Sequence, residues 1–118
     1  MLAPRALPLR RSRSDAFDDL VVESAVRLQS HWGAQLREVE FLVEDVPPAE
    51  VGGGVPLGAS RPAHGDLPAR ITVYRRPVET RAVGERARAT LVHDVVVEQV
   101  AELLGLEPET IDPDYGLD

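Results

Sequence analysis

The sequence predicts a single small α+β domain in which two helices flank a short, mainly antiparallel sheet. Three observations indicate this class. Apolar residues recur at helical spacing near both ends of the chain, they alternate with polar residues in two short segments between, and a stretch rich in glycine and proline separates those segments. With 118 residues, the chain can form one hydrophobic core but not two domains.

The first predicted helix covers residues 15–32. Ser14 or Asp15 can cap its start, and Gly33 can end it. The residues that recur at helical spacing are Phe17, Leu20, Val21, Ser24, Ala25, Leu28 and Trp32. Residues 1–14 contain four arginines and no acidic residue, which is typical of a disordered basic arm. We therefore expect the folded domain to occupy residues 15–118.

Two short segments, at residues 38–44 and 70–75, alternate between apolar and polar side chains as half-buried strands do. The side chains expected to face inward are Val39, Phe41 and Val43 in the first segment and Ile71 and Val73 in the second. Proline cannot donate a backbone hydrogen bond, so Pro47 should end the first strand and Pro77 the second.

The connection at residues 47–68 is rich in glycine and proline, and we expect a loop with one short edge strand near residues 55–57. The three glycines at 52–54 are not followed by the Lys-Ser/Thr pair of a phosphate-binding loop, so no nucleotide site is expected there.

The last predicted helix covers residues 85–104 and should end at Gly105 in a left-handed cap. Its apolar residues cover more than one face, which indicates a buried helix. The run Val95–Val97 has poor helix propensity, so tertiary burial must hold it.

Charge and composition exclude several classes of protein. All 20 acidic residues but only nine arginines lie in residues 15–118, giving that part a net charge of about −11, which repels nucleic-acid backbones. No apolar run approaches the ~20 residues of a membrane helix. The chain has no cysteine, and hence neither a disulfide nor a thiolate metal site. We expect a cytoplasmic protein with no nucleic-acid or membrane partner for its folded part.

Several segments resemble the minimal zincins, a family of small bacterial proteins described as zinc metallopeptidases. The resemblance covers about 90 of the 118 residues. It includes the acidic first helix, the segments Phe41–Pro48, Gly54–Leu57 and Leu67–Pro77, and the last helix up to Gly105. It implies that the last helix is the metal-binding helix of a small zincin-like domain.

In working zincins, that helix carries His-Glu-x-x-His followed by a glycine and an acidic third ligand. Two histidines four residues apart lie on one helical face and bind one zinc ion. The glutamate takes a proton from the water that the zinc activates.

The present sequence departs from this motif in either of two alignments. Alignment on Gly105 places Glu98 and Glu102 at the histidine positions and Gln99 at the base position, with Glu107 or Pro108 near the third ligand. Alignment on His93 instead places Asp94 at the base position and Val97 at the second histidine. We prefer the first alignment because it needs no gap before the glycine.

The substitutions in the preferred alignment are chemically severe. Gln99 can orient a water molecule but cannot take its proton. Gln99 and Asp94 are the base positions of the two alignments, and neither is assigned as a catalytic residue. Glu98, Glu102 and His93 are the candidate metal ligands. Carboxylates suit magnesium, manganese or calcium better than zinc. We therefore expect no bound cofactor, with zinc or another divalent metal as the alternative.

The same acidic residues also have an ordinary interpretation. Asp94, Glu98 and Glu102 recur every four residues, and such a stripe usually forms a solvated face of a helix. The resemblance instead directs this stripe toward a cleft, where a metal or a cationic peptide could bind.

The sequence is compatible with three functions and does not decide whether the chain is an enzyme. The first is a pseudoenzyme that keeps the zincin cleft and binds a peptide or protein partner along an edge strand. The second is an active metallopeptidase with atypical ligands drawn from His93, Asp94, Glu98, Glu102 and the acidic tail 107–114. The third is a structural interaction module that uses its arginine arm or acidic surface.

Overall fold

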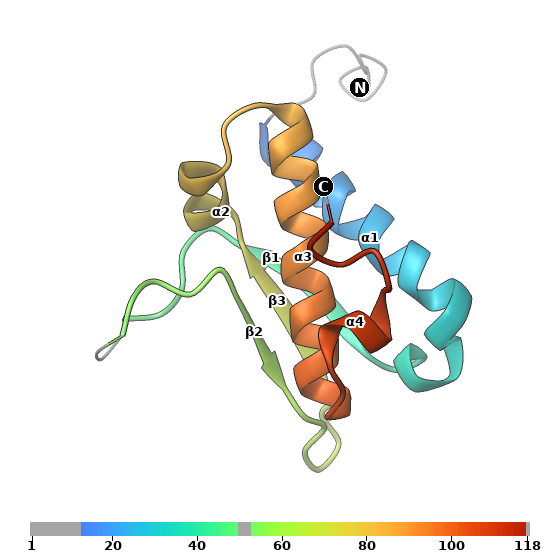
Figure 1. Ribbon diagram of the computed structural model, residues 1–118. Helices are drawn as coiled ribbons and strands as arrows, with labels where there is room; N and C mark the ends of the chain where they lie inside the picture. Colours follow the sequence, from blue (N-terminus) through green and yellow to red (C-terminus); the bar gives the residue numbers. More distant parts are fainter. Residues whose placement is uncertain (1–12, 50–52, 118) are drawn as a thin grey trace, which may run out of the picture.

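The structure is a computed structural model that describes residues 13–49 and 53–117, and it has the predicted α+β class (Figure 1). Residues 1–12 of the predicted basic arm lie outside the described residues, whereas Arg13 and Ser14 belong to the first helix. The elements are α1 (Arg13–Leu36), β1 (Glu40–Glu44), β2 (Gly58–Arg61), β3 (Arg70–Tyr74), α2 (Arg75–Arg81), α3 (Glu85–Leu104) and α4 (Pro108–Ile111).

The sheet is mixed, which corrects the prediction of a mainly antiparallel sheet. Its strand order is β1-β3-β2, with β1 parallel to β3 and β2 antiparallel to it. Strand β2 follows β1 in the chain but lies at the other edge of the sheet, and β3 lies between the two. The central strand is therefore β3, and β1 and β2 form the two edges.

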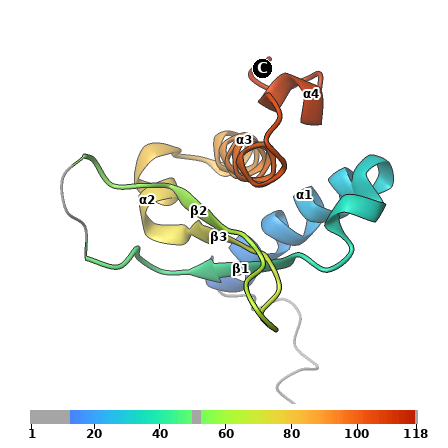
Figure 2. The same ribbon diagram turned by 90° about the horizontal axis from the view of Figure 1, so that it is seen from below.

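The two long helices pack on the same face of the sheet, as Figure 2 shows in a view along the elements. Ile71 and Val73 of β3 point to this face and are fully buried, as predicted. From α1 the core receives Phe17, Val21 and Leu28, and from α3 it receives Val92, Val95, Val96, Val97 and Val100. The short helix α4 lies beyond α1 and α3, on the side away from the sheet (Figure 2).

Helix α1 extends beyond the predicted end at Gly33. The chain departs from helical geometry at Trp32 (φ −117°, ψ 27°) and then continues to Leu36. Leu36 is fully buried, so the extra turn places an apolar side chain in the core. The indole nitrogen of Trp32 donates a hydrogen bond to the carbonyl oxygen of Ile111 at 3.0 Å, which ties the kink to α4.

Two short helices were not predicted, and both begin close to a proline. Strand β3 ends at Tyr74, near the predicted limit, but Pro77 lies in the first turn of α2 and does not end a structured segment. Pro108 lies in the first turn of α4. Proline is tolerated there because the first backbone N–H groups of a helix have no partner within it.

The predicted edge strand near residues 55–57 begins slightly later, at Gly58. The ladder is nevertheless entered at Leu57, whose carbonyl oxygen accepts a hydrogen bond from the backbone nitrogen of Tyr74 at 2.9 Å. Pro56 has no N–H to contribute, which explains why regular pairing starts after it.

Helix α3 has the predicted limits and ends at Gly105 in the left-handed conformation (φ 71°). It lies so close to β2 that a Cβ atom at Gly58 would be 2.8 Å from Val95 Cγ1 and 3.0 Å from the Thr72 carbonyl oxygen. Glycine at this position therefore sets the distance between the motif helix and the edge strand. No helix in the described part of the chain is long and apolar enough to cross a membrane.

Candidate functional site

The motif positions of the preferred alignment lie on the outer part of α3. Glu98 and Glu102 are exposed, whereas Gln99 is half-buried. A Cβ atom at Gly58 would lie 3.2 Å from Gln99 Cγ, so Gln99 packs against the edge strand β2. Val97, the second ligand position of the other alignment, is fully buried in the core and has no access to a cleft.

Glu98 is already engaged by the segment that follows α4. The hydroxyl group of Tyr115 donates a hydrogen bond to Glu98 Oε2. This bond, with partial burial and the nearby negative charges, raises the pKa of Tyr115 to about 12. Glu98, at the first ligand position, is thus hydrogen-bonded to a phenol that stays protonated at neutral pH.

His93 lies in a hydrogen-bonded cluster between α1, α3 and the segment after α4. Its Nδ1 is 2.9 Å from Ser24 Oγ, and its Nε2 is 2.6 Å from Asp112 Oδ2. The side chains of His93 and Asp112 are each 12% exposed, and Arg27 lies 3.9 Å from the same carboxylate oxygen. We call Ser24, His93 and Asp112 the His93 cluster.

The charge of Asp112 is stabilised by this arrangement. The hydrogen bond from His93 is the main cause that lowers the pKa of Asp112, and partial burial opposes it. The backbone nitrogen of Asp114 also donates to Asp112 Oδ1 at 2.9 Å. The acidic residue therefore fixes the segment after α4 against the motif helix.

The order Ser24, His93, Asp112 resembles the serine, histidine and acid of a hydrolase triad, but access excludes that role. A nucleophilic serine must reach a substrate carbonyl. Ser24 lies within α1 and is only 4% exposed. It is also absent from the walls of the small pocket of about 220 Å³ beside His93, Asp94 and Asp112. The cluster is therefore a packing and positioning device.

The geometry bears on the alternative of a zinc or other divalent metal ion held by Glu98, Glu102 and His93. Within residues 13–49 and 53–117, no group of three or more histidine or acidic side chains is arranged to hold a metal ion. Glu98 is bonded to Tyr115, and both ring nitrogens of His93 have protein partners. Glu102 remains as an exposed carboxylate. As arranged, these residues do not fit a tetrahedral zinc centre, which needs three or four converging ligands.

Next to Gln99, the sheet ends at β2, and no described strand pairs with its outer side. The backbone nitrogen of Tyr74 donates a hydrogen bond to the carbonyl oxygen of Leu57, and the pairing continues with Ala59 opposite Thr72. Because the direction of backbone groups alternates along an antiparallel strand, the N–H and C=O groups of Gly58 and Ser60 point to the outer side. They form a row of donors and acceptors beside the motif helix.

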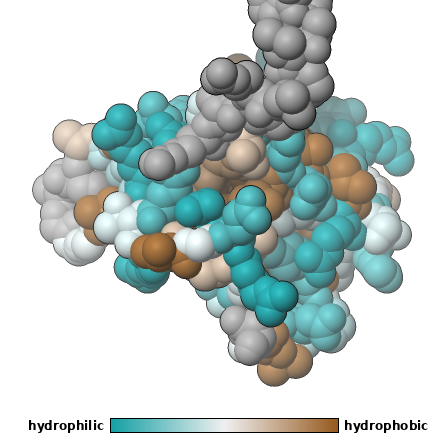
Figure 3. All heavy atoms as spheres, turned by 90° about the horizontal axis from the view of Figure 1, so that it is seen from above, coloured by the Kyte–Doolittle hydropathy of each residue, from teal (hydrophilic) through white to brown (hydrophobic). Residues whose placement is uncertain are grey.

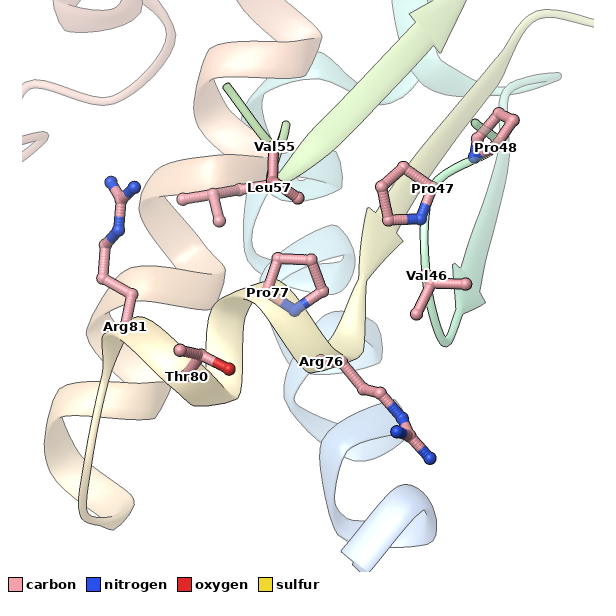
Figure 4. A pocket seen from close by; sticks show the side chains of 9 residues that line it. All are labelled: Val46, Pro47, Pro48, Val55, Leu57, Arg76, Pro77, Thr80 and Arg81. Atoms are coloured by element: carbon pink, nitrogen blue, oxygen red, sulfur yellow. The ribbon is translucent and has the colours of Figure 1, made fainter. Parts of the chain in front are cut away.

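An apolar pocket of about 570 Å³ lies at the end of the sheet where β2 begins (Figure 4). Pro47, Leu57 and Pro77 turn toward one another at its centre. The pocket continues to Val46 near β1 and to Arg81 near the start of β2. The sequence predicted a loop here but gave no sign of a pocket, because its walls come from three separate segments.

Arg75 holds two of those segments in place. Its Nε donates to Asp45 Oδ1 at 3.0 Å, and its Nη1 donates to Glu79 Oε1 at 3.0 Å. The Arg75 side chain thereby joins the end of β1 to α2. The face of the molecule seen in Figure 3 is largely hydrophilic, with patches of apolar residues between the hydrophilic ones.

A family model described as zincin-like metallopeptidase matches residues 36–117, from the end of α1 to the segment after α4. This range contains the whole sheet and the motif helix. No curated protein matches the chain.

Proposed function

Since the chain belongs to the zincin-like metallopeptidase family, we propose that it is a non-catalytic member that binds an extended segment of a peptide or protein partner along β2. One observation carries the proposal. Glu98, at the first ligand position, accepts a hydrogen bond from the Tyr115 hydroxyl group, whereas the outer side of β2, beside Gln99, has no neighbouring strand among the described residues.

Loss of catalysis is supported by the chemistry of the motif positions. Peptide hydrolysis by a zincin needs a metal-activated water and a base that takes its proton. Gln99 is an amide and cannot act as that base. Glu98 is bonded to Tyr115, and the nearest histidine on α3, His93, is held by Ser24 and Asp112.

Retention of binding is supported by the geometry of the edge strand. An extended peptide can add to an exposed sheet edge, where the main chain supplies affinity and side-chain pockets supply specificity. The outward groups of Gly58 and Ser60 can make up to four such hydrogen bonds. The fixed distance between α3 and Gly58 keeps this edge next to the motif helix.

Ser60 offers a sharp test because its N–H points outward. Ser60→Pro should remove one donor from the free edge without removing a hydrogen bond between β2 and β3, since proline is tolerated on edge strands. Ser60→Ala is the matched control because it keeps the N–H. The probe is a fluorescein-labelled peptide of sequence Ser-Thr-Val-Thr-Val-Leu with a free carboxyl end, followed by fluorescence polarisation.

We expect the wild type and Ser60→Ala to bind the probe alike and Ser60→Pro to bind it about tenfold more weakly. We also expect mass spectrometry to find the probe intact after incubation with the protein and zinc. Zinc-dependent cleavage that is lost in Glu98→Ala/Glu102→Ala would overturn the proposal in favour of an atypical peptidase. Equal binding by all three proteins would place the peptide away from β2.

A further inference from the structure

The apolar pocket at the start of β2 gives the proposed peptide a defined end. Resting on the proposed function, we infer that the pocket binds the C-terminal residue of the partner, with a bulky apolar side chain inside it and the terminal carboxylate at Arg81. The inference rests on the lining of the pocket, its charge and its position relative to β2.

The lining favours an apolar occupant. Val46 and Val55 are 56% and 63% exposed although both are apolar, and both line the pocket together with Leu57 and Pro77. Exposed apolar surface gathered in a concave site is typical of ligand binding. The pocket volume of about 570 Å³ is ample for one leucine-sized side chain together with part of its backbone.

The charge at the rim favours a carboxylate. Within the part of the chain that the structure describes, no carboxylate forms an ion pair with Arg81. This contrasts with Arg75 nearby, which is paired with both Asp45 and Glu79. A guanidinium group recognises a carboxylate through two parallel hydrogen bonds. Arg81 offers such a group at the rim of the pocket, although the protein as a whole has a net negative charge.

The position relative to β2 fixes the direction of the peptide. Figure 4 shows α2 lying across the start of β2, with Pro77 below Leu57 and Arg81 on the β2 side of the pocket. A peptide that pairs with the outer side of β2 would reach this pocket beyond Gly58, because Leu57, which precedes β2, and Pro77 and Arg81 of α2 line it. A chain antiparallel to β2 would end there in a carboxylate, whereas a parallel chain would bring its ammonium group against Arg81.

The test compares two forms of one probe on the full-length protein. The free-acid peptide Ser-Thr-Val-Thr-Val-Leu and its C-terminal amide differ only in the charge that Arg81 is inferred to bind. We expect the amide to bind at least about tenfold more weakly than the acid. Arg81→Gln should abolish that difference by weakening the acid alone. Arg37→Gln, which removes an exposed arginine that does not line the pocket, should preserve the difference.

A third probe, with an internal glutamate and an amidated end, distinguishes the source of the carboxylate. If this probe binds as well as the free acid, the site recognises an acidic side chain, and the inference of a peptide terminus is wrong. If acid and amide bind equally and Ser60→Pro weakens both, the inference fails while the proposed strand addition stands. If no probe binds, both fail.

Discussion

Substitution of Asp112 gives the most direct measure of what holds the C-terminal segment to the motif helix. Asp112 accepts hydrogen bonds from His93 at 2.6 Å and from the Asp114 backbone at 2.9 Å. Hydrogen bonds to charged groups stabilise proteins by about 1.5–3 kcal/mol each. Arg27 is 61% exposed and 3.9 Å away, so it adds little. Asp112→Asn keeps an acceptor but loses the charge, and should lower the free energy of unfolding by about 1–2 kcal/mol at pH 7.

The pH dependence of this effect has a defined sign. The pKa of Asp112 is lowered from its ordinary value of 3.8, so its charged form is favoured by folding. The stabilisation is complete above the pKa of the unfolded chain and is lost as the pH falls through the lower pKa of the folded protein. The unfolding free energies of wild type and Asp112→Asn should therefore differ at pH 7 and converge as the pH falls below 3.8 and through the lower pKa of Asp112 in the folded protein.

Urea denaturation followed by circular dichroism at pH 7, 5, 4, 3 and 2 measures this difference. Asp114→Asn is the matched control, because Asp114 contacts Asp112 through its backbone nitrogen and has an exposed side chain. It should behave like the wild type throughout. A difference between wild type and Asp112→Asn that persists unchanged at pH 2, or is absent at pH 7, would show that the charged carboxylate of Asp112 does not stabilise the fold through the His93 cluster.

Three further predictions concern the helix–strand contact, the phenol and the metal. Gly58→Ala should lower the free energy of unfolding by about 1–3 kcal/mol in urea titrations, because its Cβ would lie 2.8 Å from Val95 Cγ1 and 3.0 Å from a backbone oxygen. Gly33→Ala, with nothing within 4 Å of its Cβ, should not destabilise, and equal losses in both variants would contradict the close contact. Because the pKa of Tyr115 is raised to about 12, its bond to Glu98 should stabilise the fold below about pH 10 and be lost as the pH rises toward 12. Denaturation curves of Tyr115→Phe should lack this alkaline component, and a component that survives the substitution would have to come from another group. Elemental analysis of untagged protein purified without chelators should find far less than one equivalent of zinc or manganese. About one equivalent, lost in Glu98→Ala/Glu102→Ala, would contradict our account of the site.

Local sequence patterns predicted the main elements because their causes are local. Helical spacing identified the two long helices, and the cap at Gly105 was correct because only a flexible residue adopts a positive φ without strain. Alternation identified the buried face of β3. The parallel pairing of β1 with β3 could not be obtained in this way, because it depends on the path of the long connection at residues 45–57.

The contacts of the site were less predictable because they join distant parts of the chain. His93 bonds to Ser24, 69 residues away, and to Asp112, 19 residues away. Its sequence neighbourhood indicates only a position on a helix. The bond from Tyr115 to Glu98 depends on where the segment after α4 turns back, and α4 itself is only four residues long. The positions of Glu98, Gln99 and Glu102 relative to Gly105 were available from the motif alone.

The two sides of α3 explain why this fold tolerates substitutions at the metal-ligand positions of the family motif. Its inner side, with Val92, Val96 and Val100, is fully buried against α1 and the sheet and needs no metal to pack. Glu98 and Glu102 lie on the exposed side, so the histidines of the family motif can be replaced there without opening a cavity in the core. Gly58 is constrained by the inner packing, because a side chain there would press on Val95. Packing of the core thus constrains the position of the edge strand whether or not the chain hydrolyses peptides.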